Sequence, residues 1–158
     1  MKKIKKVAFG NDHAAAEVRN TVKEYLTSIG YEVEDLGFQG EGNCDYPDYA
    51  VKVAEAVLQG KAEKGVLICG TGIGMCIAAN KVCGIIAAPC WDEDTAVLAA
   101  QHNNADILCL GSRKATVSEL CHRIKIWLET PFEPRHEQRI SKIKEIEKKQ
   151  CKTAIREC

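Results

Sequence analysis

The sequence has 158 residues, the length of one ordinary domain, and can therefore bury a hydrophobic core of useful size. Its 46% hydrophobic and 28% charged residues are typical of globular proteins and exclude a disordered or fibrous chain. Because 22 basic Lys and Arg side chains balance 22 acidic ones, no net field attracts nucleic acid or an anionic membrane surface, and we expect neither as a partner.

The start of the chain and its cysteines indicate a cellular compartment. The basic first six residues precede only the short apolar run Val-Ala-Phe, too short for a secretory signal, and no run approaches the ~20 apolar residues of a membrane span. The nine cysteines are an odd number and include no Cys-x-x-Cys pair. We therefore expect a cytoplasmic protein with reduced, mostly buried thiols, and consider a thiol-based metal or redox protein the less favoured alternative.

Short apolar runs alternate with stretches of helical periodicity along the whole chain. The runs predict strands at residues 4–10, 31–36, 65–69, 84–88 and 106–110. Between and after them, apolar residues at three- and four-residue spacing predict helices ending at Gly30 and Gly60, a short one ending near Val82, and others at 92–102 and 117–128. A charged helix follows at 135–150, and its isoleucines form only a narrow apolar stripe.

This order of elements predicts an α/β fold: a single Rossmann-like, three-layer domain with a five-stranded parallel sheet and right-handed crossovers. We expect residues 1–131 to form the α/β core and residues 132–158 a C-terminal helix and tail. The narrow stripe on that helix favours packing against a partner subunit. Ligands of such sheets bind beyond the carboxyl ends of the strands, so the residues directly after each strand are the candidates for a site.

Polar residues follow the first predicted strand. Gly10 and Asn11 precede Asp12 and His13, which place a carboxylate and an imidazole at the start of a helix, where backbone N–H groups favour an anion. Asn11 or Asp12 equally suits plain N-capping, although capping gives His13 no role.

The most informative segment follows the third predicted strand. Cys69 begins a loop in which Gly70, Gly72 and Gly74 alternate with Thr71 and Ile73, exposing successive N–H groups to a phosphate or a developing oxyanion. No Gly-Lys-Ser/Thr ends the loop and its spacing departs from GxGxxG, so nucleotide binding is disfavoured. Beside such donors the Cys69 thiolate could act as base or nucleophile. The alternative is a buried strand cysteine before a tight turn.

Further candidates follow the later strands. His102 and Asn103 end a predicted helix, and His102 could move protons at neutral pH or simply complement the helix dipole. Arg113 follows the fifth strand, and Arg135 and Arg139 share one face of the last helix; they are phosphate clamps or solvated surface arginines. Together the post-strand segments indicate acid–base chemistry on a phosphorylated small molecule.

These segments, in this order, resemble the ribose-5-phosphate isomerase B family, which also includes the galactose-6-phosphate isomerase subunits. The resemblance extends from the first strand to the last helix, through DH at 12–13, DYP at 45–47, VLICGTGIGMCIAANK at 66–81, QHNNADILCLGSR at 101–113 and RHEQRI at 135–140.

The resemblance implies an aldose–ketose isomerase that works through a cis-enediolate without metal or other cofactor. Ribose 5-phosphate and ribulose 5-phosphate are the expected pair. A hexose 6-phosphate, such as allose or galactose 6-phosphate, is the alternative substrate, and a sugar-phosphate-binding module without turnover is the alternative function. The family also implies a homodimer, or a dimer of dimers, with the active site at the subunit interface.

The resemblance further implies a role for each matching residue. Cys69 is the base, Thr71 assists proton movement between oxygens, and His102 opens the sugar ring. Substrate binding is shared among sugar contacts at Asp12, Tyr46 and Asn103, enediolate contacts at the backbone of Gly70, Gly72, Ile73 and Gly74, and phosphate contacts at His13, Arg113, Arg135 and Arg139. Near this set the chain departs from many relatives at Ile86, Pro89 and Trp91, which leaves the preferred sugar open.

Overall fold

The structure, a computed structural model, describes residues 5–154, and its core is a five-stranded, all-parallel sheet with the strand order β2-β1-β3-β5-β4. The strands are β1 (Lys6–Asn11), β2 (Glu32–Asp35), β3 (Lys64–Cys69), β4 (Ala87–Cys90) and β5 (Ile107–Gly111). The α-helices are α1 (Ala16–Ser28), α2 (Tyr46–Leu58), α3 (Ile73–Asn80), α4 (Glu93–Gln101), α5 (Val117–Glu129) and α6 (Glu137–Ala154), with short 3-10 helices η1 (His13–Ala15), η2 (Ser112–Lys114) and η3 (Pro134–His136). The predicted Rossmann-like α/β class is confirmed.

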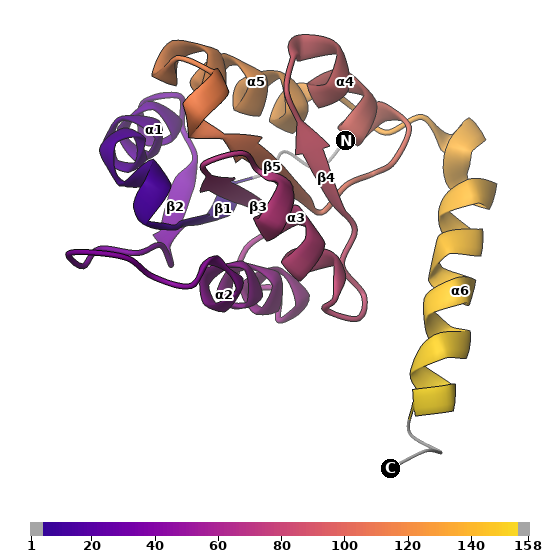
Figure 1. Cartoon of the computed structure of the whole chain (residues 1–158). Helices are drawn as coiled ribbons and strands as arrows, with labels where there is room; N and C mark the ends of the chain where they lie inside the picture. The colour runs from indigo at the N-terminus through magenta and orange to yellow at the C-terminus, as the bar shows by residue number, and fades with distance from the viewer. Residues whose placement is uncertain (1–4, 155–158) are drawn as a thin grey trace.

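Helices cover both faces of the sheet, as Figure 1 shows, with α1, α4 and α5 on one face and α2 and α3 on the other. Alternate residues of β3 enter the two layers: Val66 and Ile68 pack with the first group of helices, Leu67 and Cys69 with the second. This burial on both faces explains why the β3 sequence is nearly all apolar.

The chain order places the sheet's reversal point between β1 and β3. These two strands are neighbours, but the chain leaves β1 for β2 on one side and continues from β3 toward β4 and β5 on the other. In such sheets the loops after the two central strands diverge and leave a crevice. The segments that follow Asn11 and Cys69 therefore flank the expected ligand site.

The strand predicted at residues 84–88 begins later than expected, because β4 runs from Ala87 to Cys90. Gly84 ends a turn with a left-handed φ of +92°, and residues 85–86 are irregular, with the Ile86 amide donating to the Asp106 carboxylate at 2.9 Å. Pro89, which has no N–H, is tolerated inside β4 because this edge strand pairs only with β5.

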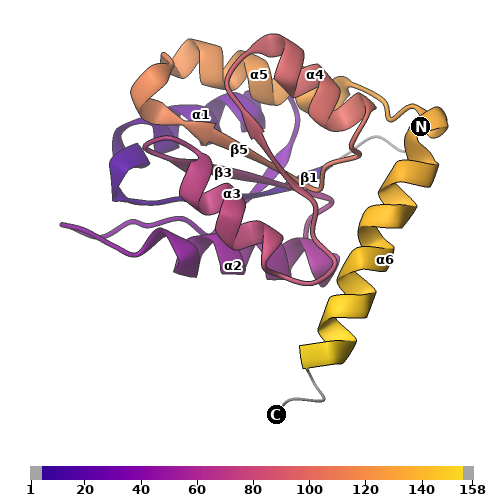
Figure 2. The same cartoon turned by 45° about the vertical axis from the view of Figure 1, so that its right-hand side comes forward.

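The last helix lies beside the α/β layers in both views of Figures 1 and 2. Ile140 is buried, whereas Ile143 and Ile146 are 45% and 62% exposed. In the far part of α6, a Glu147 carboxylate oxygen accepts a hydrogen bond from the Gly84 amide at 2.9 Å. The packing of α6 on a partner subunit remains a prediction, and the predicted ends at residue 4 and residues 155–158 lie outside the described residues. Within residues 5–154, no helix combines the length and the apolarity needed to cross a membrane.

Candidate active site

The loop after β3 holds a cysteine against a backbone amide. The Sγ atom of Cys69, which is 4% exposed, accepts a hydrogen bond from the Gly72 N–H at 3.1 Å. Gly72 has a φ of +81°, and a Cβ atom there would lie 2.9 Å from the carbonyl carbon of Leu110. Only glycine satisfies both the conformation and the space, so the loop depends on this residue.

The same loop ends at the N-terminus of α3. The first-turn amides of a helix have no acceptor within the helix, so those of Ile73 and Gly74 are directed toward the loop. The Ile73 amide donates to the Thr71 hydroxyl oxygen at 3.3 Å, and Thr71 is exposed. Amides arranged in this way can stabilise negative charge that develops on a substrate oxygen.

Two predicted side chains pack directly against the glycines. A Cβ atom on Gly70 would lie 2.9 Å from the guanidinium carbon of Arg113, and one on Gly74 would lie 2.6 Å from the Cζ atom of Tyr46. The backbone amide of Arg113 also donates to the Gly70 carbonyl at 3.1 Å. A cation and a phenol therefore flank the loop.

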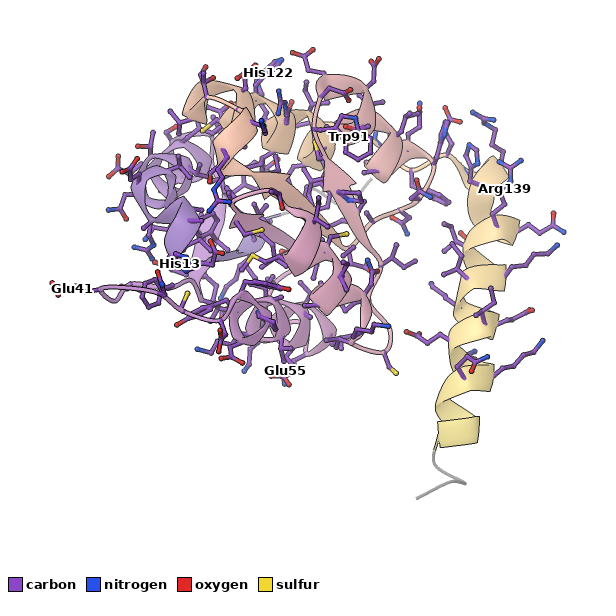
Figure 3. The ribbon with its side chains drawn as sticks, viewed as in Figure 1. His13, Glu41, Glu55, Trp91, His122 and Arg139 are labelled. Atoms are coloured by element: carbon purple, nitrogen blue, oxygen red, sulfur yellow. The ribbon has the colours of Figure 1, made fainter. Side chains whose placement is uncertain are left out.

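The segment after β1 lies alongside. The Asp12 amide donates to the carbonyl of Ile68 at 3.3 Å, and its carboxylate caps η1 by accepting from the Ala14 amide at 2.9 Å. His13, labelled in Figure 3, accepts a hydrogen bond at Nδ1 from the Cys44 amide at 3.2 Å. The capping role considered for Asp12 is thus present, and the His13 ring is oriented by the loop that precedes α2.

Ser112 is a residue that the sequence analysis missed. Its hydroxyl lies 3.2 Å from the carbonyl oxygen of Cys69 and 3.0 Å from that of Ala14, so it can donate to either and links the segments after β1, β3 and β5. A polar residue directly after a predicted strand was the available signal, but its partners depend on the sheet order.

We name the group formed by Asp12, His13, Tyr46, Cys69, Thr71 and Arg113 the loop cluster.

The other predicted residues gather at the end of α4. A capping box between Asp92 and Thr95 sets the start of α4, and the helix ends with His102 at its C-cap. The Glu133 amide donates to the carbonyl of Gln101 at 2.9 Å and brings the segment before α6 to this helix end. Arg135 Nη2 lies 3.4 Å from His102 Nε2.

His136 belongs to this second group and was also missed. Its ring centroid lies 4.1 Å from that of His102, and Arg139 Nη1 donates to its Nδ1 atom at 2.9 Å. Burial, reinforced by Arg135, lowers the pKa of His136, so the ring is neutral at pH 7. We name His102, the adjoining exposed Asn103, Arg135, His136 and Arg139 the helix-end cluster.

The two clusters lie at opposite ends of the sheet. Cys69 is paired with Gly111 at the carboxyl end of β5, whereas His102 precedes the start of β5, where the Ala105 amide bonds the Ala99 carbonyl of α4. At about 3.3 Å per residue, the five residues of β5 place its carboxyl end, beside Cys69, roughly 13 Å from its start, beside the end of α4. Figure 3 likewise shows His13 and Arg139 on opposite sides of the molecule. One chain therefore does not bring the whole predicted set together.

An apolar cavity of about 550 Å³ adjoins the loop cluster at Thr71. Its lining includes Ile73, Ile77 and Trp91, which are 61%, 58% and 64% exposed. Exposed side chains of this size, grouped beside a site, are typical of surfaces that another protein covers.

Comparison with known proteins decides the family. The sequence model of the family described as ribose/galactose isomerase matches residues 7–143. The chain belongs to this family. As a member of the ribose/galactose isomerase family, it is a sugar-phosphate isomerase, as the resemblance implied.

Individual proteins of this family match over most of the chain. The ribose-5-phosphate isomerase B of Escherichia coli is 40% identical over 92% of this chain and 99% of its own. The D-erythrulose-4-phosphate isomerase of Pectobacterium atrosepticum is 44% identical over 80% of this chain and 84% of its own.

Solved structures of the family have the same fold. The ribose-5-phosphate isomerase B of Clostridium thermocellum superposes with a TM-score of 0.89 at 43% identity, covering 92% of this chain and 99% of that one. The enzyme of Mycoplasma genitalium, solved with bound ribulose 5-phosphate, superposes with a TM-score of 0.86 at 42% identity, covering 90% and 96%.

Proposed function

We propose that this isomerase interconverts ribose 5-phosphate and ribulose 5-phosphate through a cis-enediolate, with Cys69 as the base. The observation that carries the proposal is the position of the Cys69 sulfur at the foot of the amide loop, 3.1 Å from the Gly72 N–H. A donor aimed at sulfur stabilises negative charge there, and thiolate is the form that accepts a proton.

The chemistry moves one proton between two carbons. Cys69 takes the proton from C2 of the open-chain aldose, the electron pair forms the enediolate, and the same thiol returns the proton to C1 to give the ketose. Thr71 assists the exchange of the hydroxyl proton between O1 and O2. Each well-aimed donor to such an oxyanion contributes roughly 3–4 kcal/mol, so the loop amides can supply much of the required stabilisation.

The remaining residues bind the sugar and open its ring. Asp12 and Tyr46 contact the ring oxygen and hydroxyls, while His13 and Arg113 contact the phosphate from the loop cluster. His102 moves the proton that opens the ring, Asn103 holds the sugar, and Arg135 and Arg139 complete the phosphate site. No resident metal or cofactor is required by these roles.

We further propose a homodimer, alone or paired into a dimer of dimers, in which each site combines the loop cluster of one chain with the helix-end cluster of its partner. Two observations support it: the clusters of one chain lie at opposite ends of the sheet, and exposed Ile73, Ile77 and Trp91 border the loop cluster. Two-fold symmetry makes two such sites at once.

Mixing two inactive variants tests the shared site. Cys69→Ala and His102→Gln homodimers should each lack turnover. After denaturation and refolding together, random pairing gives heterodimers with one intact site, so about a quarter of wild-type activity should return. No recovery from correctly refolded mixed dimers would contradict the shared site, and recovery cannot arise if Cys69 and His102 act within one chain.

The substrate is tested with a panel of sugar phosphates. We expect wild-type turnover of ribose 5-phosphate, with chelator and reductant present, to exceed that of allose, galactose and erythrulose phosphates, and Cys69→Ala to bind sugar phosphate without converting it. A higher kcat/KM for a hexose 6-phosphate or a tetrose phosphate would reassign the substrate. Saturable binding without turnover of any sugar would identify a binding module instead.

A further inference from the structure

Three potential metal ligands converge where the segment between α5 and α6 meets the end of α4. His102, Glu133 and His136 each offer a ligand atom, and these atoms lie within 4.8 Å of one another. Ligand atoms around a tetrahedral Zn²⁺, with bonds of about 2.0–2.1 Å, are about 3.4 Å apart. Small side-chain rotations therefore suffice to close the three around one ion.

The backbone holds the three residues in this arrangement without a metal. The Glu133 amide bonds the carbonyl of Gln101, the neighbour of His102, and the His136 amide bonds the Glu133 carbonyl at 3.0 Å. The two imidazole rings already lie 4.1 Å apart. Binding would thus order little additional chain.

His136 supplies an independent indication of a ligand site. Its side chain is 4–5% exposed, yet among the described residues its Nε2 atom has no hydrogen-bond partner. That atom faces Glu133, whose Oε2 lies 3.8 Å away, beyond hydrogen-bonding distance. Buried polar atoms are almost always satisfied, and a metal ion between Nε2 and the carboxylate would satisfy this one.

We propose that His102, Glu133 and His136 bind a divalent transition-metal ion, Zn²⁺ above all, and that the ion inhibits the isomerase by occupying His102. Two imidazoles and a carboxylate with an open fourth position suit Zn²⁺ and its first-row neighbours, whereas Mg²⁺ and Ca²⁺ prefer oxygen ligands alone. The inhibition rests on the proposed role of His102, but the binding does not.

Two arginines oppose metal binding through their bonds to the ligand residues. Arg135 Nε donates to Glu133 Oε2 at 2.5 Å, and Arg139 donates to His136 Nδ1, which places the proton of the neutral ring on Nε2. Binding at Nε2 moves that proton to Nδ1 and displaces Arg139. Because the Arg135 side chain is 66% exposed, it can turn into solvent, and we expect Arg135→Gln to bind the metal more tightly.

Cobalt titration of the full, reduced chain tests the site apart from catalysis. After metal removal, bound Co²⁺ should give a visible absorption spectrum typical of nitrogen and oxygen ligands. Zn²⁺ should displace the Co²⁺, whereas Mg²⁺ should not. Glu133→Gln and His136→Gln should each weaken binding by about tenfold or more. Glu137→Gln, a matched exposed neighbour, should not. An intense thiolate-to-cobalt band would place the ion on cysteines. An affinity for Co²⁺ that is unchanged in both ligand variants would place the ion away from these three residues. Either result would overturn the proposal.

Inhibition is measured separately, with each variant compared with its own metal-free rate. Zn²⁺ should inhibit the wild-type protein at the concentrations that displace Co²⁺, and Glu133→Gln should need about ten times more. Binding at this site without inhibition would overturn the inhibitory role. If no sugar phosphate were converted, the proposed function would fail, while the cobalt titration would still decide the metal site.

Discussion

The Gly72 amide donates a 3.1 Å hydrogen bond to the sulfur of Cys69, three residues earlier in the chain. Gly72 itself has a left-handed conformation, with a φ of +81°, in the turn between Cys69 and α3. The glycine therefore acts on the proposed base through the backbone, and its own lack of a side chain is the condition for that action.

Replacing Gly72 with alanine should damage both the fold and the reaction. The left-handed φ and the 2.9 Å approach to Leu110 should lower the free energy of unfolding by about 2 kcal/mol or more. Loss of the aligned amide should lower kcat by about 10²-fold. Chemical denaturation and steady-state kinetics measure the two effects.

Gly60→Ala is the matched control, since Gly60 has a φ of +69° and an added Cβ there would meet nothing within 4 Å. It should lose only stability, and an equal loss of kcat in both variants would contradict the role of Gly72.

Removing the hydroxyl of Ser112 should loosen the support of Cys69. Ser112→Ala leaves the carbonyls of Cys69 and Ala14 without this donor, so we expect unfolding to become easier by about 1 kcal/mol and kcat to fall several-fold. Thermal unfolding and kinetics check both changes. Exposed Ser118 on α5 is the control position, and Ser118→Ala should change neither quantity. Unchanged kcat in Ser112→Ala would show that the link is dispensable for catalysis.

The pH dependence of stability should reveal the ion pair at Asp35. Burial alone would raise the pKa of this carboxyl, but hydrogen bonds from Lys23 and Arg19 hold the pKa below its usual value. Because the folded-state pKa is lower than the unfolded one, the stabilisation is present above about pH 4 and is lost as the pH falls through the folded-state value.

Asp35→Asn should therefore lower the free energy of unfolding by about 1–3 kcal/mol at pH 7. The difference from wild type should shrink as the pH falls below about 4, as urea denaturation at several pH values would show. Glu41→Gln, at an exposed loop position, is the control. A difference that stayed constant down to low pH would contradict the charge-dependent contribution of Asp35.

A charge at Ile77 should separate the subunits. Ile77 is 58% exposed and lines the apolar cavity beside Thr71, so Ile77→Asp should disfavour any dimer that covers this surface. We expect a monomer by analytical ultracentrifugation and loss of turnover, because the partner's helix-end cluster would no longer reach the site. Val51→Asp, at another exposed apolar position on α2, should remain dimeric and active. A dimeric, active Ile77→Asp protein would place the interface elsewhere.

The sequence alone determined the elements and the chemistry within single segments. Hydrophobic periodicity marked the five strands, because burial on two faces leaves a nearly all-apolar run in β3. The loop from Cys69 to Gly74 was recognisable because its glycines act locally, through the backbone of adjacent residues. The predicted start of β4 was wrong, because the sequence does not reveal that this strand lies at the sheet edge, where Pro89 is tolerated.

Which segments meet depends on the packing of the complete fold. Ser112 reaches Cys69 because β5 pairs with β3, and His136 stacks on His102 because the segment before α6 returns to the end of α4. The same packing separates the loop cluster from the helix-end cluster. Such contacts join residues far apart in the chain and depend on strand order, register and crossover direction, which arise from the packing of the whole domain rather than from any local pattern.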